Sequence, residues 1–568
     1  MSWSSGPEFR CPSFSLVRLF AMPGMGKTGK AGWSREANAV HFSTSALRKS
    51  CSVPYLSFNP SNFGTFRDFR LSALNDLLSL IQEKRRPKTG RRRLGIHGVY
   101  KRKALKVKPV DSDQSDGSKP EIKARWKQDV WARLKPVFEP PGPYGKWLIP
   151  KFSGLARGSR VTPERLAAMQ IGDNLLDQEK DLLIEMIYNR EAAFAWTFAE
   201  IGKAVPEVSP PVKIKTVPHE AWQVASFPIA KSLRPVVIGM LKERLEQGLL
   251  EYSQGPYRNP WFLVAKKEKK KYRLINSATR ANAVTVRDAN LPPSADEFSE
   301  NFAGCAISSL IDLFSGYDQI ELDPTSRDLT AFATPLGLLR LTRLPQGATN
   351  SVAQFMRVTT TILADRIPED CDPFMDDIGV KGPKTTYEGE EICPGIRRYV
   401  LEHIQSLDRT LTDIELSGCT ISGAKSKFCV PGVKIVGYVC DIEGRRPETA
   451  KVIKILEWPP CENITEVRAF VGVCVYYRIW VKNFAVVAGP FYRLTRKNVP
   501  FKWTAEHDQA MGTLKEALTT APALVSLDYN LEAGEIILAV DASGEGWGAV
   551  LIQIVDKRRC PNRYESGL

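Results

Sequence analysis

The stretch "PFMDDIG", residues 373–379, places two carboxylates side by side inside an otherwise apolar segment. The apolar residues around Asp376 and Asp377 predict a strand and a tight turn that pack against a core. Two like charges at this spacing repel each other, and burying either one without a partner is costly. The pair therefore lies either in a solvated turn, where Asp is common, or next to a strong positive charge.

A third carboxylate, Asp312, ends the apolar segment "SSLID" at 308–312. The flanking Leu310 and Leu313 predict that this segment is a strand of a sheet. If that strand lies beside the 373–379 hairpin, three carboxylates meet, and such a cluster needs cations. Mg²⁺ prefers carboxylate oxygens and usually keeps positions for phosphate. Two such ions about 3.5–4 Å apart can stabilise the attacking and leaving oxygens of a phosphoryl transfer.

Basic residues are concentrated in the N-terminal quarter of the 568-residue chain, whose net charge is +16. Residues 1–160 hold 31 Lys and Arg against 11 Asp and Glu, whereas the rest of the chain holds 48 against 52. Residues 84–108 contain twelve basic residues and no acid. Such a block binds polyanions without sequence preference. The alternative is a solvated, disordered arm.

Other features of the composition exclude several classes of protein. No apolar run approaches 18 residues, so we expect no transmembrane helix and no membrane partner. The 11 Cys include no CxxC pair and the five His lie far apart, which argues against a zinc site or a disulfide framework and favours an intracellular protein. The segment "HFSTSALRKS" (41–50) resembles the end of a fungal mitochondrial transit peptide. The alternative is an arbitrary basic leader on a cytoplasmic or nuclear protein.

The order of predicted elements indicates an α+β protein. Helical spacing covers 177–196 and 236–250, and the prolines of 205–218 exclude a helix there. From about 259 the pattern changes to short strands between turns, with hairpins expected at 261–276, 372–382 and 433–444. Helices follow at 461–481 and 504–522, and a last pair of strands at 535–553. Residues 1–160 lack sustained periodicity and read as a largely disordered leader.

Several ordered motifs resemble the reverse transcriptase of gypsy-type LTR retrotransposons. They are "LIDLFSGYDQIEL" (310–322), "LTAFATPLGLLRLTRLPQGATNS" (329–351), "FMDDIG" (374–379), "CTISGAKSKF" (419–428) and "IVGYVCDIEGRRPE" (435–448). The segment 467–504 resembles the region that follows the polymerase, and "LAVDASGEGWGAVL" (538–551) resembles the first strands of the attached RNase H. The resemblance covers roughly 160–568.

The resemblance implies a right-hand polymerase fold of fingers, palm and thumb, followed by a connection region and the first strands of an RNase H-like domain. The implied division is a basic leader at 1–160, an extension into the fingers at 161–258, fingers and palm at 259–445, thumb and connection helices at 446–525, and a truncated RNase H-like domain at 526–568.

The resemblance also assigns roles around the carboxylates. Asp312, Asp376 and Asp377 match the palm carboxylates that bind two Mg²⁺ ions, or Mn²⁺, which would activate a primer 3′-hydroxyl and neutralise an incoming triphosphate. Lys425 matches a palm lysine that protonates pyrophosphate. Tyr317 matches a steric gate whose ring excludes a 2′-hydroxyl; the alternative is a core tyrosine.

Further positions match the nucleotide-binding residues of the family. Gln346 matches a residue that contacts nucleotide and template, and Gly347 lets the backbone approach closely. Arg273 matches the fingers arginine, whose planar fork suits phosphate oxygens. Lys266 or Lys267 would be the second cation for the triphosphate; the alternative is a solvated hairpin tip.

Some positions depart from the family pattern. Phe374 stands where the family usually has Tyr, Ser277 where it usually has Asp, and Ala348 where a bulkier residue is common. The first removes a hydroxyl and keeps the ring, and each of the others could weaken the grip on nucleotide or template. None is a metal ligand.

Asp541 matches the first carboxylate of the RNase H site. Among the residues after Glu545, Asp556 and Glu565 are the only acids, and neither has the context of the other RNase H carboxylates. We therefore expect no RNase H activity from this chain.

The sequence thus predicts an RNA-directed DNA polymerase that extends a primer on an RNA or DNA template, using dNTPs and Mg²⁺. The alternative is a degenerate remnant of a retroelement polyprotein that only binds nucleic acid. The sequence does not decide the oligomeric state.

Overall fold

The computed structural model divides the chain into two compact units, residues 105–445 and residues 446–568 together with 1–104. The structure describes residues 160–265, 272–290, 292–530, 532–544 and 546–568, the single residue Lys127, and the backbone of two strands at 15–20 and 41–43. The rest of the predicted leader, including the basic block 84–108 and most of the transit-like segment 41–50, lies outside the described residues. Each unit is described by itself.

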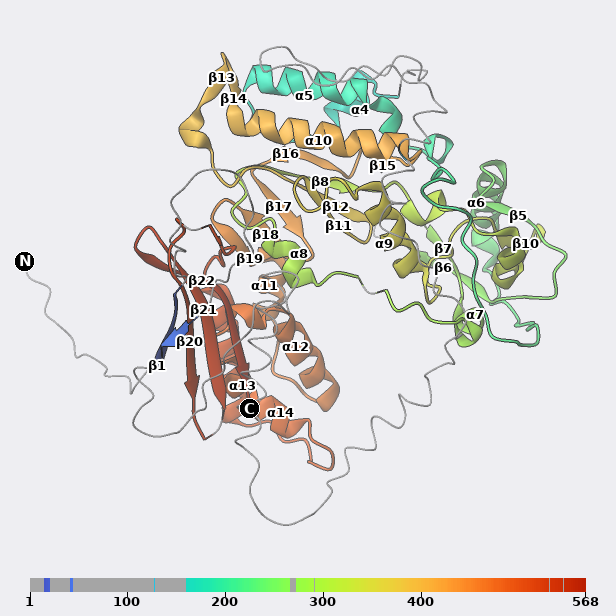
Figure 1. Ribbon diagram of the computed structural model, residues 1–568. Helices are drawn as coiled ribbons and strands as arrows, with labels where there is room; N and C mark the ends of the chain where they lie inside the picture. The colour runs from blue at the N-terminus through green and yellow to red at the C-terminus, as the bar shows by residue number, and fades with distance from the viewer. Residues whose placement is uncertain are drawn as a thin grey trace, which may run out of the picture. The chain divides into compact units, whose positions relative to one another are not determined.

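The centre of the 105–445 unit is a five-stranded sheet (Figure 1). Its order is β11 (Cys371–Phe374), β12 (Asp377–Lys381), β8 (Ser308–Asp312), β16 (Lys427–Val430) and β3 (Gln170–Ile171). The first four strands pair antiparallel, and β3 runs parallel to β16. The predicted hairpin at 372–382 is confirmed as β11–β12, and β8 lies directly beside it.

Two helices cover one face of this sheet, as Figure 1 shows. Helix α10 (Arg398–Leu416) packs against β12 and β16, and α5 (Asp177–Asn189) packs on α10. The apolar residues of α10 recur at helical spacing and are buried, among them Val400, Ile404, Leu407 and Leu411. The expected helix at 177–196 is shorter than predicted, because α5 ends at Asn189 before a 3₁₀ turn at Glu191–Ala193.

A buried polar chain ties α10 to the back of the sheet. The Cys429 N–H donates to Ser309 Oγ at 2.9 Å, and Ser309 Oγ lies 2.7 Å from His403 Nε2. His403 Nδ1 lies 3.2 Å from the Lys381 carbonyl oxygen. All these groups are satisfied when His403 is neutral and carries its proton on Nδ1. Burial accordingly lowers the pKa of His403 to about 4.

This histidine predicts an acid-sensitive fold. His403 takes up a proton at lower pH in the folded chain than in the unfolded chain, where its pKa is 6.5. The free energy of unfolding should therefore fall as pH drops from 6.5 towards 4, by about 3 kcal/mol from this residue. We expect the thermal midpoint of the wild-type chain to drop more between pH 7 and pH 5 than that of His403→Gln. The control His219→Gln, outside this network, should follow the wild type. Equal drops in all three proteins would contradict the assignment.

A smaller subdomain is built from segments that come before and after β8 in the chain. It contains a three-stranded sheet, β5 (Leu250–Tyr252), β10 (Gly337–Leu341) and β9 (Phe332–Thr334), and the hairpin of β6 (Trp261–Ala265) and β7 (Tyr272–Asn276). The hairpin confirms the prediction at 261–276. Helix α6 (Arg234–Glu246) packs on β5, and a separate core joins Val237, Leu241, Leu250, Trp261, Phe332 and Leu339. Helix α7 (Thr279–Val284) follows β7.

Shorter elements complete this unit. Helices α8 (Ala295–Glu300) and α9 (Ser351–Ile362) both contact β11. The predicted hairpin at 433–444 is β17 (Gly432–Ile435) and β18 (Tyr438–Asp441), and its turn residues Val436 and Gly437 both have positive φ, as a type I′ turn requires. The remaining elements are α4 (Pro163–Ala167), β4 (Phe194–Ala195), β13 (Glu391–Cys393), β14 (Ile396–Arg397), β15 (Ile421–Ser422) and β19 (Gly444–Pro447), which contains the boundary between the units.

The C-terminal unit contains helices followed by a sheet. The helices are α11 (Thr449–Leu456), α12 (Ile464–Tyr476), α13 (Phe484–Val487), α14 (Gly489–Leu494) and α15 (Ala505–Thr519). The sheet order is β2 (His41–Ser43), β1 (Ser15–Phe20), β20 (Ile536–Ala542), β21 (Trp547–Val555) and β22 (Arg558–Gly567). The two N-terminal strands fall inside the leader predicted to be largely disordered; β1 pairs with the edge of β20, where unpaired backbone groups are available.

None of the helices within the described residues is both long enough and apolar enough to cross a bilayer. The α+β architecture predicted from the sequence is confirmed, with the strand-rich segment between 259 and 445 and the helices and last strands after it.

Candidate active site

The register of two neighbouring strands brings the predicted carboxylates together. Asp312 ends β8 and Asp377 begins β12, and the two residues are direct cross-strand partners. The Leu313 N–H donates to the Asp376 carbonyl oxygen at 3.2 Å, which extends the pairing to the turn. Side chains directly opposite each other on antiparallel strands have Cβ atoms about 4.5–5.5 Å apart. The predicted convergence of strand 308–312 with the 373–379 hairpin is therefore confirmed.

The turn that carries Asp376 has an unusual backbone. Phe374 pairs with Asp377, so Met375 and Asp376 alone connect β11 to β12. Met375 has φ 56°, in the left-handed region that residues with a side chain rarely adopt. A two-residue hairpin loop with positive φ at its first position normally has Gly there. The turn is thus held against a local preference, and strain of this kind is often found at functional sites.

Burial, with the charge of neighbouring carboxylates, raises the pKa values of Asp377 and Asp312. Burial, then the Asp376 and Asp312 charges, raise the pKa of Asp377 to about 6. Burial is also the largest reason that the pKa of Asp312 is raised, and the Asp376 charge adds to it. Asp376 itself is exposed at the tip of the turn. A local excess of negative charge that is partly shielded from water favours the binding of a cation.

Lys425 is the cation that the chain itself places here. Its Nζ lies 3.0 Å from Asp312 Oδ1 and 3.3 Å from Oδ2, and this contact lowers the Asp312 pKa against the effect of burial. The Lys425 side chain is 67% exposed, whereas that of Asp312 is 20% exposed. The lysine can therefore leave the carboxylate at little cost, since exposed ion pairs are weak. The structure places Lys425 beside Asp312, and the role that the resemblance implies for it stays a prediction.

The donor set suits a hard divalent ion. Asp312 and Asp377 face each other across two strands, Asp376 is close enough to affect the pKa of both, and all supply oxygen atoms. Among the described residues, no three or more His, Cys, Asp or Glu side chains are grouped so that they could hold a metal ion by themselves. Water and substrate phosphates would have to complete the shell of an ion such as Mg²⁺.

Tyr317 lies next to this cluster. It is in a 3₁₀ turn (Gly316–Gln319) that follows β8, and its ring stacks on Phe355 of α9 at 4.8 Å between centroids and 16° between planes. Burial and the Asp376 charge raise the Tyr317 pKa, so its hydroxyl stays protonated. A Cβ on Gly316 would meet the Phe355 ring at 2.7 Å, so only glycine permits this packing. The ring is fixed rather than mobile.

Gln346 and Gly347 form an exposed turn after a buried Pro345. Gly347 has φ 86°, which explains the glycine. Asn282 of α7 holds this turn from both sides: its Nδ2 donates to the Gly347 carbonyl at 3.0 Å, and its Oδ1 accepts from the Thr349 N–H at 2.7 Å. Sequence reasoning missed Asn282. An Asn in the middle of a short helix is unfavourable for helix formation, and that was the available signal.

The predicted phosphate-binding cations are only partly described. Arg273 lies on β7 opposite Val264 of β6 and is exposed. Lys266 and Lys267 lie outside the described residues. Arg273 is therefore available to a ligand, and the structure records no contact between it and the carboxylate cluster.

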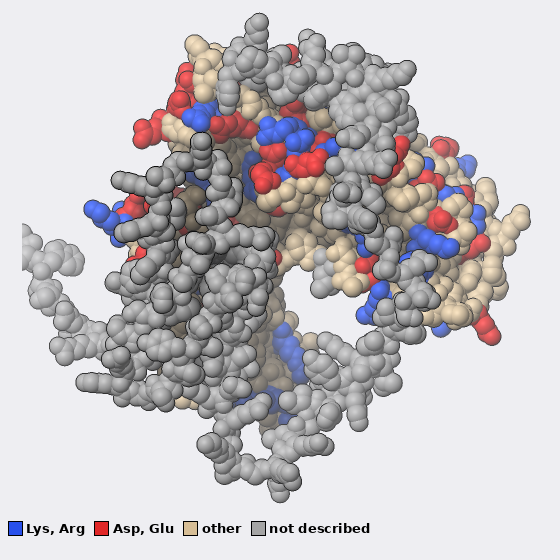
Figure 2. Space-filling view, in the orientation of Figure 1, with Lys and Arg blue, Asp and Glu red and all other residues tan. Residues whose placement is uncertain are grey.

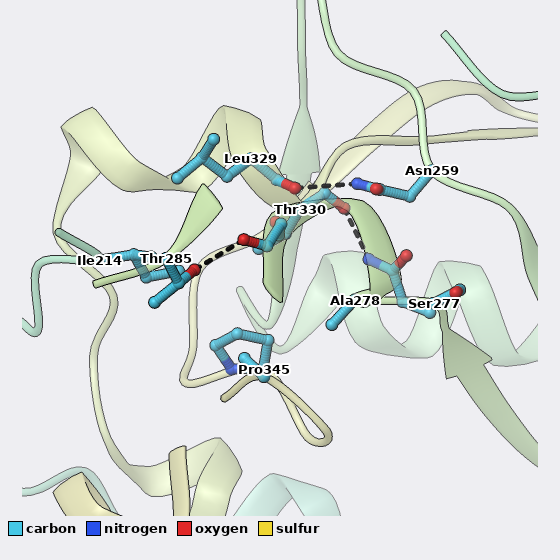
Figure 3. A pocket seen from close by; sticks show the side chains of 11 residues that line it. Ile214, Asn259, Ser277, Ala278, Thr285, Leu329, Thr330 and Pro345 are labelled. Atoms are coloured by element: carbon cyan, nitrogen blue, oxygen red, sulfur yellow. Dashed lines mark hydrogen bonds between the residues drawn. The ribbon is translucent and has the colours of Figure 1, made fainter. Parts of the chain in front are cut away.

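Two of the departures from the family pattern border the same cavity, which Figure 3 shows. Ser277 and Ala348 line a space of about 20 Å³, together with Asn276, Thr330 and other residues. That is room for about one water molecule. Asn276 donates through Nδ2 to the Thr330 carbonyl at 2.6 Å, whereas its buried Oδ1 has no hydrogen-bond partner. The two small residues thus leave a defect at the base of the 276–290 segment.

The third departure is well packed. The ring of Phe374 stacks on that of Phe298 of α8, with 5.1 Å between centroids and 28° between planes, so the ring packs here without a hydroxyl.

In the other unit, Asp541 lies on β20 opposite Gly548 and is exposed. The expectation that this unit lacks RNase H activity stays a prediction.

Comparison with known proteins agrees with this site. Residues 264–440 match the family model described as "Reverse transcriptase (RNA-dependent DNA polymerase)", and residues 503–567 match "RNase H-like domain found in reverse transcriptase". The carboxylates, Tyr317, Gln346 and Lys425 all lie within the first match. The RNase H-like match begins before the predicted start at 526 and includes α15.

Several retroelement polyproteins are similar to the chain. The retrovirus-related Pol polyprotein from transposon 412 of Drosophila melanogaster is 30% identical over 331 residues, which is 57% of this chain and 25% of the relative. That from transposon gypsy is 26% identical over 400 residues, or 67% of this chain and 36% of the relative. The Gag-Pol polyprotein of koala retrovirus is 29% identical over 440 residues, or 72% and 24%. The chain spans about a quarter to a third of the length of these relatives.

Solved structures show the same fold. The foamy viral protease-reverse transcriptase in complex with dsDNA aligns with a TM-score of 0.61 and 21% identity over 73% of this chain and 82% of that one. Its complex with an RNA/DNA hybrid aligns with a TM-score of 0.57 and 21% identity over 73% and 54%. The chain is thus similar to Pol-like reverse transcriptases with an RNase H-like domain, and it has a mixed α+β reverse transcriptase fold.

Proposed function

We propose that the chain is an RNA-directed DNA polymerase that extends a primer 3′-hydroxyl with dNTPs. The observation that carries this proposal is the direct pairing of Asp312 with Asp377 across β8 and β12, with Asp376 beside them on the turn. Asp312 and Asp377 are two carboxylates whose pKa values are raised by burial, and burying such charges does not stabilise the fold. Their use is in binding charge.

Asp312, Asp376 and Asp377 are the residues that would hold two Mg²⁺ or Mn²⁺ ions. Such ions supply charge neutralisation for the triphosphate and acidify the primer hydroxyl. Lys425 lies within hydrogen-bond distance of Asp312 and is exposed enough to turn towards a leaving pyrophosphate, to which it can donate a proton.

The proposal also gives roles to Tyr317, to the Gln346–Gly347 turn and to Arg273. The Tyr317 ring, fixed on Phe355, would close the space under the sugar of the incoming nucleotide. The exposed turn of Gln346 and Gly347, held by Asn282, would contact nucleotide and template. Arg273 on the β6–β7 hairpin would bind triphosphate oxygens through its fork of N–H donors.

The nucleic-acid partner is a primer paired with an RNA or DNA template. The foamy viral structures of the same fold are complexes with dsDNA and with an RNA/DNA hybrid, which supports both kinds of duplex. Because base pairing supplies the sequence, the protein would read mainly the shape and backbone of the duplex. The basic block 84–108 would add affinity that depends on salt.

The proposed division of labour assigns 259–445 to fingers and palm, 446–525 to thumb and connection helices, and 526–568 to the RNase H-like domain. The chain divides into its two compact units between Arg445 and Arg446, which supports the boundary between palm and thumb at this position. The match of 503–567 to an RNase H-like domain begins before the proposed start at 526, and it supports placing the whole of α15 with the C-terminal strands.

A non-catalytic remnant that only binds nucleic acid is the second candidate. It is favoured by the cavity beside Ser277 and Ala348, since a defect at the base of the segment that holds the Gln346 turn would loosen the grip on nucleotide and template. The carboxylates and Lys425 do not border this cavity.

Primer extension separates the two candidates. With Mg²⁺, an RNA template and a DNA primer, the wild-type chain should extend the primer, and Asp376→Asn should not. Both proteins should still retain the primer–template in a gel-shift assay, since the change leaves the basic residues in place. Asp372→Asn, on β11 of the same hairpin and paired with Lys381 at 3.1 Å, is the matched control and should extend. Retention without extension by the wild type would favour the remnant.

A further inference from the structure

The backbone amide of the strained turn residue has a side-chain partner on another element. The Met375 N–H donates to the Sδ atom of Met356, at 2.9 Å between nitrogen and sulfur. Met356 lies on α9 and is 6% exposed, and 19 residues separate the two methionines in the sequence. The contact is partly buried, and a thioether sulfur is a weak acceptor for a backbone N–H.

This contact holds Met375, the turn residue whose backbone conformation is unfavourable for a residue with a side chain. Met375 is the turn residue with φ 56°, and Asp376 and Asp377 follow it directly. On its other sides the turn is held by the Leu313 N–H, which donates to the Asp376 carbonyl, and by Phe374, which stacks on Phe298. Without an acceptor for its own N–H, Met375 can relax towards an ordinary φ, and that rotation moves the Asp376 side chain.

Helix α9 is suited to this task because two successive residues contact two parts of the site. Phe355 stacks on Tyr317, and Met356 accepts from Met375. The helix also packs against both β11 and the 3₁₀ turn of Tyr317, and Figure 1 shows it beside the β11–β12 hairpin. Its buried face includes Ala353, Phe355 and Val358, so the Met356 sulfur is held in place by the same core that holds the helix.

We propose that Met356 is a positioning residue of the polymerase site: its sulfur accepts the Met375 N–H and thereby holds the Asp376–Asp377 turn in register with Asp312. The role in catalysis rests on the proposed function, whereas the hydrogen bond itself does not. Met356 acts through Met375 and touches no reacting atom. Sequence inspection gives it a different role, since a Met at helical spacing among apolar residues normally only fills the core.

Two variants of Met356 distinguish the effect of its sulfur as an acceptor from the effect of its side-chain volume. Met356→Leu keeps an apolar side chain of similar volume and removes the acceptor. Met356→Gln keeps the length and offers an amide oxygen, which accepts an N–H more strongly than sulfur does. Met186→Leu is the matched control, because Met186 is a fully buried methionine of α5 in the core of the same unit. The two readouts are single-nucleotide primer extension and hydrogen exchange of the Met375 amide.

We expect Met356→Leu to lower kcat about tenfold, the loss of roughly one hydrogen bond, with KM for dNTP changed by no more than about twofold. The Met375 amide should exchange faster in this variant. Met356→Gln should restore kcat and protection to at least the wild-type level, and Met186→Leu should match the wild type in both. Equal kcat loss in Met356→Leu and Met356→Gln, or unchanged Met375 exchange in Met356→Leu, would overturn the proposal.

The outcomes also distinguish this proposal from the proposed function. If the wild-type chain does not extend primers, the polymerase assignment fails, and the Met375 exchange rates of the same four proteins still decide whether Met356 holds the turn. If the wild type extends primers and Met356→Leu behaves as Met186→Leu does, the positioning role fails and the polymerase assignment stands.

Discussion

Asp377→Asn is expected to abolish primer extension, with kcat lower by about 10³-fold or more, because the amide cannot supply the negative charge that a divalent ion needs. Asp377 is the residue of the cluster whose pKa is raised to about 6 by burial and by its two acidic neighbours. Its carboxylate faces that of Asp312 across the strand pair, so the substitution leaves only one of these two facing carboxylates to bind an ion. Quenched primer-extension time courses would measure the effect.

The same substitution should make the metal-free chain more stable. In the folded chain Asp377 keeps its proton up to a higher pH than in the unfolded chain. Its contribution to stability is therefore full below about pH 4 and is lost as pH rises through about 6. At pH 7.5 without divalent ions, Asp377→Asn should unfold with a free energy higher by about 2 kcal/mol than the wild type. Loss of activity with a gain in stability is the signature of a site built for binding charge.

The control for this prediction is Asp372→Asn on the neighbouring strand. Asp372 accepts from Asn301 Nδ2 at 2.9 Å and pairs with Lys381, so its removal should lower stability and leave extension within about tenfold of the wild type. Adding Mg²⁺ should raise the thermal midpoint of the wild type and of Asp372→Asn, and not that of Asp377→Asn. An active Asp377→Asn protein, or one less stable than the wild type without metal, would contradict this account of the site.

Tyr317→Val should let the proposed polymerase use ribonucleotides. The Tyr317 ring is stacked on Phe355 and lies close enough to Asp376 for that charge to raise its pKa, so the proposed function places it beside the sugar of the incoming nucleotide. A fixed ring rejects a 2′-hydroxyl by steric clash, and a shorter side chain removes the clash. We expect the ratio of kcat/KM for dNTP over rNTP to fall by about 10²-fold.

Tyr317→Phe is the control that separates the ring from its hydroxyl. It keeps the ring and its stacking, so its preference for dNTP should stay within a few-fold of the wild type. Discrimination lost in Tyr317→Phe would assign the role to the hydroxyl group, and discrimination kept in Tyr317→Val would make Tyr317 a core tyrosine. Steady-state kinetics with matched dNTP and rNTP on one template decide between these results.

Much of the site follows from the sequence because the strands that carry its residues have strong local patterns. The hairpins at 261–276 and 372–382 have strong turn and strand patterns, and two acids at the ends of neighbouring buried strands can only meet if the strands pair. Lys425 was selected only through the resemblance of "CTISGAKSKF" to the family motif, and the structure places it in contact with Asp312. The inferences on the hairpins and the acids needed only strand pairing and the order of segments.

The residues that sequence reasoning missed act through hydrogen bonds between distant segments. Asn282 lies 65 residues before Gly347, and its two bonds to the Gln346 turn depend on how α7 packs, which no periodicity specifies. Met356 belongs to an apolar helix face and looks like any other core residue. The same limit applies to the cavity beside Ser277 and Ala348, because two small residues 71 positions apart form a defect only after folding.

The most direct test of the central claim is Mn²⁺ binding, measured by electron paramagnetic resonance in the presence of primer–template and dNTP, for the wild type, Asp312→Asn and Asp372→Asn. The account predicts that Asp312→Asn loses at least about tenfold in Mn²⁺ affinity, while Asp372→Asn binds as the wild type does. Equal Mn²⁺ affinity in the wild type and Asp312→Asn would show that the carboxylates which meet at the end of β8 and β12 do not hold the ion, and the polymerase assignment would lose its basis.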